Sequence, residues 1–235
     1  MWVVSTSCKN ECRVVKERFD SGAELIVHIY PDCSDTTRYK RIVFFEAGLP
    51  ASEGARELGQ KVGRYKSWYA NGQQEADWEV LDNAEHGLIT CWYDNGKVKK
   101  VSTLKRGVEE GLFKSWYDDG HLDSEGEFDK GKKNGLWKYW TKDGLLTERT
   151  YKDGSLNGPT FEVLDDGRKV RGLYRNGKEQ GKWVWVDSLD RLNEIAFYDE
   201  GLVDSVAIGC YPNGQVREKH VYKKGKLISA KEYPL

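Results

Sequence analysis

The stretch GLFKSWYDDGH, which runs from Gly111 to His121, decides the fold because three close copies of it stand in the same chain. GRYKSWYANGQ begins at Gly63, GLITCWYDNGK at Gly87 and GLWKYWTKDGL at Gly135, so the four copies start every 24 residues. Each copy has a tryptophan five residues after its first glycine, and a second glycine, preceded by Asn or Asp, nine residues after it. A fixed period of this length is the signature of a repeat protein, whose units bury their apolar side against one another.

Weaker copies extend the pattern in both directions. Downstream, blocks begin at Gly158, at Gly181 and at Ser205, and in the Gly181 block Asp190 takes the place of the turn glycine. Upstream, residues 44–48 fit one block earlier and residues 19–22 form a degenerate copy. We therefore expect about eight repeats in all.

Turn dipeptides indicate that each block is a β-hairpin. Asn-Gly or Asp-Gly recurs in the blocks, as at Asn71-Gly72 and Asp119-Gly120, and these dipeptides favour type I′ turns. A second turn glycine follows within each block, as at Gly107. Gly126 lies in a return strand, where the lack of a side chain would let a neighbouring ring lie flat on the backbone. We predict an all-β fold, an elongated, twisted or curled antiparallel β-meander of tandem hairpins.

The blocks resemble the MORN repeat, in the bacterial variant found in YwqK-type antitoxins. In the Gly135 block, Trp137, Asp143-Gly144, Tyr151 and Gly154 stand at the family's spacing, and the Gly111 block matches in the same register. The resemblance covers residues 39–235, which we expect to form one repeat domain, and residues 1–38 match poorly and look like an N-terminal cap with a degenerate repeat.

The resemblance implies an antitoxin or immunity protein that binds a cognate secreted toxin stoichiometrically and blocks its active site. A scaffold that mediates protein–protein or membrane-lipid interaction, as in eukaryotic MORN proteins, is the alternative.

Aromatic residues in the strands are the candidates for partner binding, because aromatic side chains dominate binding hot spots. Taken singly, each tryptophan is better explained as part of the structural spine. The candidates on one expected face are Tyr65, Tyr69, Tyr93, Phe113, Tyr117, Trp137 and Tyr139. Those on the opposite face are Trp68, Trp92, Trp116 and Trp140, and the second choice is the C-terminal group of Trp183, Trp185, Phe197 and Tyr198.

Composition narrows the class of partner. The 37 Lys and Arg residues nearly cancel the 38 Asp and Glu residues, which gives a formal net charge of −1. Binding to a nucleic-acid backbone or to anionic lipid needs clustered positive charge. We therefore expect a protein partner and no nucleic acid.

The sequence predicts neither an enzyme nor a metal or cofactor site. His28, His86, His121 and His220 show no metal-ligand spacing, and no nucleophile motif or phosphate-binding loop is present. Cys8 and Cys12 with Cys33 and His28 are the nearest approach to a metal cluster, but a disulfide or free thiols explain these cysteines better. An enzyme with accessory repeats would need a further domain of ~100 residues.

The N-terminal cysteines leave the compartment open. Trp2-Val3-Val4 followed by Ser5-Thr6-Ser7-Cys8 fits the end of a lipoprotein signal, which would anchor the chain to a membrane through Cys8. A disulfide among Cys8, Cys12 and Cys33 would also place the protein in the periplasm or cell envelope, guarding against an envelope-active effector such as a lipase. Free thiols in a cytoplasmic protein are the alternative.

Overall fold

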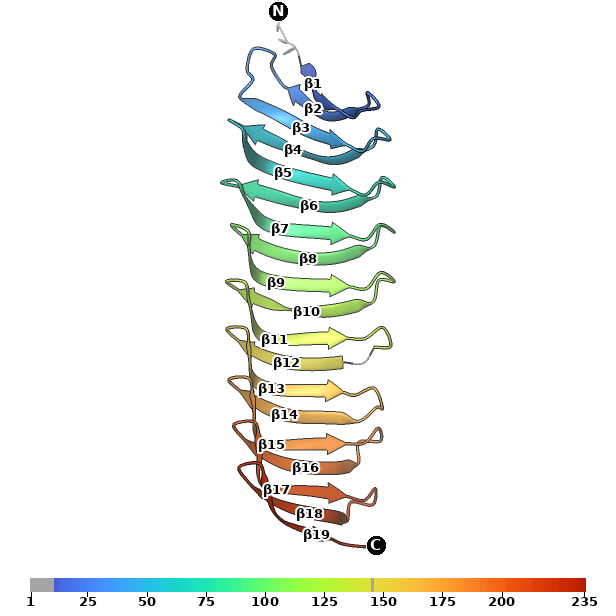
Figure 1. The fold of residues 1–235 in the computed structure, drawn as a ribbon, viewed down its shortest axis with the longest axis vertical. Helices are drawn as coiled ribbons and strands as arrows, with labels where there is room; N and C mark the ends of the chain where they lie inside the picture. The colour runs from blue at the N-terminus through green and yellow to red at the C-terminus, as the bar shows by residue number, and fades with distance from the viewer. Residues whose placement is uncertain (1–10, 145) are drawn as a thin grey trace, which may run out of the picture. The chain divides into compact units, whose positions relative to one another are not determined.

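Antiparallel β-strands make up all the regular structure of the described residues. The computed structural model describes residues 11–144 and 146–235, and no helix occurs among them. Its strands, β1 to β19, belong to one sheet that is not closed, and the recorded pairs of strands join consecutive strands (Figure 1). The predicted all-β antiparallel meander of hairpins is confirmed.

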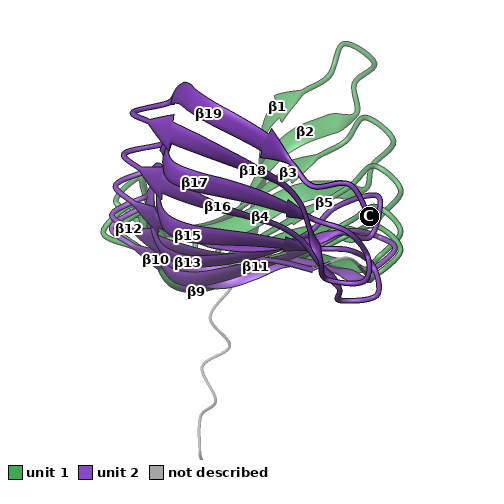
Figure 2. Ribbon diagram, turned by 90° about the horizontal axis from the view of Figure 1, so that it is seen from below, with its two compact units in different colours: residues 1–111, 115–120 green, residues 112–114, 121–235 purple. Residues whose placement is uncertain are grey.

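The chain divides into two compact units, which Figure 2 colours separately. Unit 1 comprises the described residues up to 111 together with 115–120, and unit 2 comprises 112–114 and 121–235. The strands of unit 1 are β1 (Cys12–Arg18), β2 (Glu24–Tyr30), β3 (Arg38–Phe44), β4 (Pro50–Glu57), β5 (Gln60–Trp68), β6 (Gln74–Leu81), β7 (Ala84–Trp92) and β8 (Val98–Lys105). Strand β9 (Val108–Trp116) contributes residues to both units.

Unit 2 continues with ten further strands. They are β10 (Leu122–Asp129), β11 (Lys132–Trp140), β12 (Leu146–Lys152), β13 (Ser155–Val163), β14 (Lys169–Arg175), β15 (Lys178–Val186), β16 (Leu192–Asp199), β17 (Leu202–Cys210), β18 (Val216–Lys223) and β19 (Lys226–Glu232). From β5 to β17 each odd-numbered strand begins a few residues before the first residue of a block, so the period of the blocks is the period of the hairpins.

The Asn-Gly turns are five-residue turns, and the prediction of type I′ geometry for them is wrong. In the turn after β5, the Gly72 amide donates to the Tyr69 carbonyl and the Tyr69 amide donates to the Gln73 carbonyl, both at 2.9 Å. Gly72 has a φ of +85°, whereas Asn71 keeps a negative φ. A type I′ turn needs positive φ at both central residues. Asn71 instead uses its Oδ1 to accept the amide of Gln73 at 3.0 Å.

The same five-residue turn closes the weaker copies of the repeat. Its two backbone hydrogen bonds recur around Gly22 and around Gly48. In the Gly181 block the predicted substitute is confirmed, because Asp190 has a φ of +62° and donates its amide to the Asp187 carbonyl. The repeat geometry therefore persists where the consensus residues are lost.

Type I′ geometry is found at the second turn of each block. Between β8 and β9, Arg106 and Gly107 have φ values of +52° and +79°, and two residues suffice to reverse the chain. A glycine provides the second left-handed residue in most of these turns, whereas Asn83 provides it between β6 and β7, with a φ of +63°. The two-residue loop fixes the register of the paired strands.

The first residue of each block lies inside a strand, at a β-bulge. Gly63 has a φ of +69° in β5, and the register of β4 with β5 shifts beside it, between Gly54 and Ala55. In the last block Ser205 occupies this position with a φ of +75°, a conformation that costs a non-glycine residue free energy. At the bulge β5 has two residues more than β4, because Gly54 pairs with Tyr65 and Ala55 pairs with Val62, so the alternation of side chains keeps its phase across the bulge.

Rings packed on glycines form much of the small core. The indole of Trp137 in β11 lies on Gly126 of β10, as expected for that glycine, and Trp137 is only 1% exposed. Tyr65 on Gly54 and Trp183 on Gly172 repeat the arrangement. A ring stacked on a bare backbone loses most of its water-accessible apolar surface, which stabilises an otherwise thin sheet.

Candidate functional site

The strand register defines two faces of the sheet. One face carries the third residue of each block, together with the residues that pair with it across the strands. We call this face the aromatic face. These residues are Tyr65, Ile89, Phe113, Trp137, Thr160, Trp183 and Ala207. The opposite face carries the fourth residue of each block, and we call it the ion-pair face.

Cross-strand ion pairs cover much of the ion-pair face. Arg64 binds Asp77 through two contacts of 2.6 Å, and this hydrogen bond lowers the pKa of Asp77. In unit 2, Lys114 lies 2.9 Å from Glu125 and Lys138 lies 3.8 Å from Glu148. Charges that already satisfy one another across strands are typical of a solvated outer surface.

In unit 1 the aromatic face carries rings among basic side chains. The rings of His28 and Tyr39 stack with centroids 4.2 Å apart, and those of Tyr65 and Trp78 lie 5.8 Å apart. Burial, followed by the charges of Lys16, Arg41 and Arg56, lowers the pKa of His28. The imidazole is therefore neutral at physiological pH, and the positive charge here belongs to the arginines and lysines.

A shallow hollow of about 470 Å³ follows in unit 1. Its lining includes Trp78, Ile89, Cys91 and Lys100. Burial raises the pKa of the Cys91 thiol, which keeps it protonated at neutral pH. A protonated thiol is a poor nucleophile, so this hollow offers apolar surface rather than chemistry.

In unit 2 the aromatic face carries what we call the first ring cluster, Phe128, Trp137, Tyr139 and Tyr151. The centroid of the Trp137 ring lies 4.9 Å from that of Phe128, 6.1 Å from that of Tyr139 and 6.5 Å from that of Tyr151. The Lys133 ammonium lies 4.3, 4.8 and 5.5 Å from the centroids of Trp137, Tyr139 and Tyr151. Lys133 Nζ also donates to Tyr139 Oη at 2.8 Å. The cluster is thus an aromatic cage that the chain fills with its own cation.

Two repeats further along lies the second ring cluster, Tyr174, Trp183, Trp185 and Tyr198. The centroid of Trp183 lies 5.1 Å from that of Tyr174, 6.0 Å from that of Trp185 and 5.9 Å from that of Tyr198. Trp183 is 5% exposed, and the other three rings are partly open to solvent. Burial and the carboxylates nearby raise the pKa of Tyr174 and of Tyr198, so both hydroxyls stay neutral.

The predicted partner-binding residues separate into distinct places. Tyr65, Phe113, Trp137, Tyr139, Trp183 and Trp185 lie on the aromatic face. By alternation along their strands, Trp68, Trp92, Trp116 and Trp140 lie on the ion-pair face and are half-buried, and Phe197 also belongs to that face. Tyr117 is half-buried at the end of β9.

Two of the predicted tyrosines connect successive repeats. The Tyr69 hydroxyl donates to the Trp92 carbonyl at 2.9 Å, and the Tyr93 hydroxyl donates to the Trp116 carbonyl at 2.8 Å. Tyr211 makes the same kind of bond to the Tyr233 carbonyl. These hydroxyls hold one hairpin to the next, which is a structural role.

Sequence reasoning named Tyr198 but missed the other three return-strand members of the clusters and the cation of the first. Phe128, Tyr151 and Tyr174 stand near the end of their blocks, where the quoted repeat pattern already has an aromatic residue. Their regular spacing was the available signal. Lys133 carried no such signal, because lysine is common at exposed turn positions and the contact of its ammonium with the rings depends on how the side chains meet across strands.

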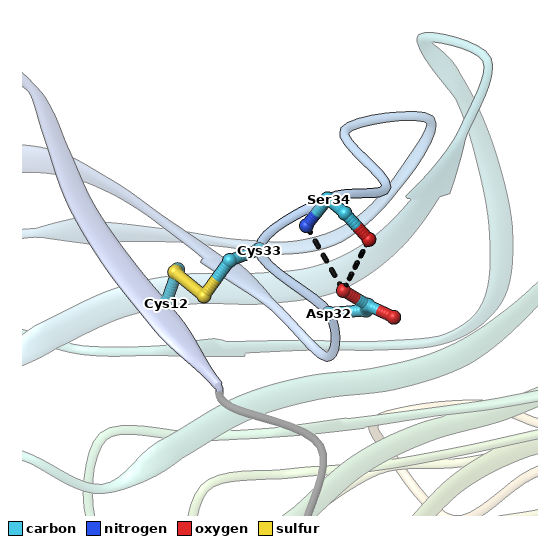
Figure 3. The surroundings of a disulfide bond; sticks show 4 residues. All are labelled: Cys12, Asp32, Cys33 and Ser34. Carbon is cyan, nitrogen blue, oxygen red and sulfur yellow. Dashed lines mark hydrogen bonds between the residues drawn. A yellow bond between two sulfur atoms is a disulfide. The ribbon is translucent and has the colours of Figure 1, made fainter.

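A disulfide joins Cys12, at the start of β1, to Cys33, in the loop after β2 (Figure 3). The Cα atoms are 5.3 Å apart, and beside the bridge the Asp32 carboxylate accepts the backbone amide and the hydroxyl of Ser34. The sequence left open which of Cys8, Cys12 and Cys33 pair. Cys8, with the expected lipid anchor, lies outside the described residues.

The described residues contain neither a cluster that could hold a metal ion nor a helix that could cross a membrane. Within residues 11–144 and 146–235, no group of three or more His, Cys, Asp or Glu side chains is close enough together to hold a metal ion. None of the described segments forms a helix that could cross a membrane.

The fold and the aromatic face define a β-hairpin repeat scaffold. In agreement with this class, the family model described as MORN repeat variant matches residues 85–105 and 109–130. These matches fall on the hairpins β7–β8 and β9–β10, in register with the blocks that start at Gly87 and Gly111. No curated protein matches the chain.

Proposed function

We propose that this protein is a binding scaffold that holds a protein partner on its aromatic face. The observation that carries the proposal is the contrast between the two faces. Cross-strand ion pairs cover much of the ion-pair face, whereas the aromatic face of unit 2, although it carries the pair of Arg149 and Glu162, leaves the rings of Trp185, Tyr198 and Tyr174 partly open to solvent. Aromatic side chains that stay accessible on a rigid sheet are the usual anchors of protein interfaces.

Charge favours a protein over a membrane as the partner. The aromatic face carries Arg41 and Arg56 in unit 1, but it carries Glu179 and Glu194 in unit 2. Anionic lipid would be repelled by such carboxylates, while a protein surface can present complementary charges to each. Within this proposal the chain has no catalytic activity of its own, binds no cofactor or nucleic acid, and would touch a membrane through a lipid anchor alone.

Copurification with two matched variants tests the scaffold. A tagged protein is isolated from its native host, and partners are identified by mass spectrometry with the wild type, Trp185→Ala and Leu136→Ala. Leu136 lies on the ion-pair face and is 48% exposed, so its loss controls for removal of a large apolar side chain. We expect Trp185→Ala to lose the partner and Leu136→Ala to keep it. Equal retention by both variants would reject the aromatic face as the binding surface, and flotation with anionic liposomes would then identify a lipid ligand.

In its more specific form, the proposal identifies the partner as a secreted toxin that the protein neutralises by covering its active site. Support comes from the resemblance of the repeats to those of antitoxins and from the Cys12–Cys33 disulfide, which suits an oxidising compartment such as the periplasm. An effector that acts on the envelope, such as a lipase, would be met there. Coexpression with the secreted protein encoded next to it should abolish that protein's toxicity at a one-to-one ratio. Undiminished toxicity would exclude the toxin and leave the scaffold to be tested as above.

A further inference from the structure

The two ring clusters of unit 2 occupy equivalent positions in different repeats. Trp137 and Trp183 are each the third residue of a block, and each lies on a glycine of the preceding strand, Gly126 or Gly172. The planes of Phe128 and Trp137 meet at 78° and those of Tyr174 and Trp183 at 85°. The partly stacked neighbours, Tyr139 and Trp185, are inclined to their tryptophans by 25° and 31°. The clusters therefore have the same architecture.

They differ at the residue that supplies the cation. In the β10–β11 hairpin, Lys133 is paired with Phe128 and extends its ammonium over the rings. In the β14–β15 hairpin, the residue paired with Tyr174 at the same place is Glu179. Among the described residues, no cation–π contact is made to the rings of the second ring cluster. The second cluster thus keeps the aromatic walls without the ammonium that fills the first.

Carboxylates lie around the second ring cluster, and Arg149, the cation that also acts on Tyr174, is bound to Glu162 at 2.9 Å. Glu179 contributes to raising the pKa of both Tyr174 and Tyr198, after burial in each case, which places its carboxylate near both rings. Glu194 is paired with Trp185 across β15 and β16. Nearby ion pairs are Lys178 with Glu200 and Arg191 with Asp187, and neither uses Glu179 or Glu194. Rings and carboxylates together attract a cation more strongly than either does alone.

From this comparison we infer that the second ring cluster is a pocket for a lysine side chain supplied by the protein partner. The first cluster shows which group such walls accept, an alkylammonium lying over a tryptophan. Trp185 stands where the first cluster has the acceptor Tyr139, so in the second cluster the Glu179 carboxylate would be the acceptor. Glu179 stands where Lys133 stands in the first cluster, and its carboxylate would pair with the ammonium of a lysine from the partner. The inference rests on the proposed function, since it names the anchor that the partner would insert.

A titration with small probes tests the pocket without any partner protein. The indole Nε1–H signals of Trp183 and Trp185 are followed by NMR while Nα-acetyl-lysine methylamide is added, and then with the norleucine analogue, which has the same stem without the ammonium. We expect concentration-dependent shifts with the lysine probe alone. Equal shifts with both probes would overturn the inference.

Glu179→Lys supplies the decisive variant, because a lysine at this position should fill the cluster as Lys133 fills the first. We expect its affinity for the lysine probe to fall at least about fivefold. Glu46→Lys makes the same change of charge in an exposed turn of unit 1 and should bind as the wild type does. Undiminished binding by Glu179→Lys would overturn the pocket.

Lys133→Met gives an independent check that does not depend on the folding of Glu179→Lys. Emptying the first ring cluster should create a new response of the Trp137 indole to the lysine probe, and its absence would show that these walls do not hold an ammonium. Failure of the probe experiments would overturn the lysine pocket alone, whereas equal partner retention by Trp185→Ala and Leu136→Ala would reject the aromatic face itself.

Discussion

The indole of Trp137 lies so close to Gly126 that a Cβ on this glycine would come within 2.3 Å of ring atom Cδ2. Gly54 beneath Tyr65 and Gly172 beneath Trp183 show the same close approach. Where the ring is lost at Ile89, a large side chain, Trp78, stands opposite in place of glycine, whereas Ala196 pairs with Ala207. The first of these exchanges keeps the packing dense although the sequence varies.

Gly126→Ala should therefore destabilise unit 2. The new methyl group forces the Trp137 ring off the backbone, and overpacking of this kind typically costs about 1–3 kcal/mol. Thermal unfolding and hydrogen exchange of the β10–β11 amides would measure the loss.

The background Trp137→Ile provides the control, because Ile89 holds the same position in another block. With the ring gone, adding Gly126→Ala should cost less than it does in the wild type, with a coupling free energy of about 1 kcal/mol or more. Additive effects of the two substitutions would mean that the ring and the glycine do not act as a pair.

Much of the fold was predictable because it depends on local and periodic signals. The 24-residue spacing of the block starts predicted the hairpins, and Gly126 predicted a ring packed on the backbone. Asp190 was predicted to replace the turn glycine. Turn type was predicted wrongly because Asn-Gly also suits a five-residue turn, in which the glycine alone is left-handed and the Asn side chain accepts an amide.

The candidate site was less predictable because it depends on which side chains meet across strands. Alternation puts Lys133 and Trp137 on the same face, but it does not show that the Lys133 ammonium lies over the rings of Trp137, Tyr139 and Tyr151. Lys133 and Glu179 can be compared only when the rings around them are known to occupy equivalent positions, which the sequence does not show. The pairing of Cys12 with Cys33 likewise depends on the register of β1 and β2.

Ser205→Gly should stabilise the C-terminal repeats. Ser205 holds a φ of +75° at the bulge position that glycine occupies in the preceding blocks. Relief of this strain, reduced by the larger entropy that glycine gives the unfolded chain, should leave a gain of about 0.5–1 kcal/mol. Hydrogen exchange of the β17 and β18 amides would detect it. Ser229→Gly, in the exposed strand β19, should lower stability instead, and a gain from both variants would contradict the strain argument.

Asp77→Asn should lower thermal stability at neutral pH and have little effect in strong acid. The hydrogen bond from Arg64 lowers the pKa of the Asp77 carboxyl from 3.8, so its stabilising contribution is present above that value and is lost as the pH falls through the lower folded-state pKa. The gap in melting temperature between wild type and variant should therefore narrow as the pH falls below 3.8 and close below the folded-state pKa. Glu46→Gln, in an exposed turn, should show no comparable gap at any pH, and a gap for Asp77→Asn that persisted in acid would have another cause.

Reduction of the Cys12–Cys33 disulfide should loosen β1 and β2 before the rest of unit 1. The bridge closes a loop with a sequence separation of 21, and its removal should destabilise this hairpin by about 2–4 kcal/mol. Because each hairpin is held mainly by its neighbour, the loss should appear as faster hydrogen exchange at Ile26 and Val27, with β5–β8 little affected. Cys91→Ser removes a thiol that is free and should leave the response to reductant unchanged. Non-reducing peptide mapping of the protein from its host should find Cys12 joined to Cys33, and free thiols at both positions there would argue against an oxidising compartment and so against an envelope toxin as the partner.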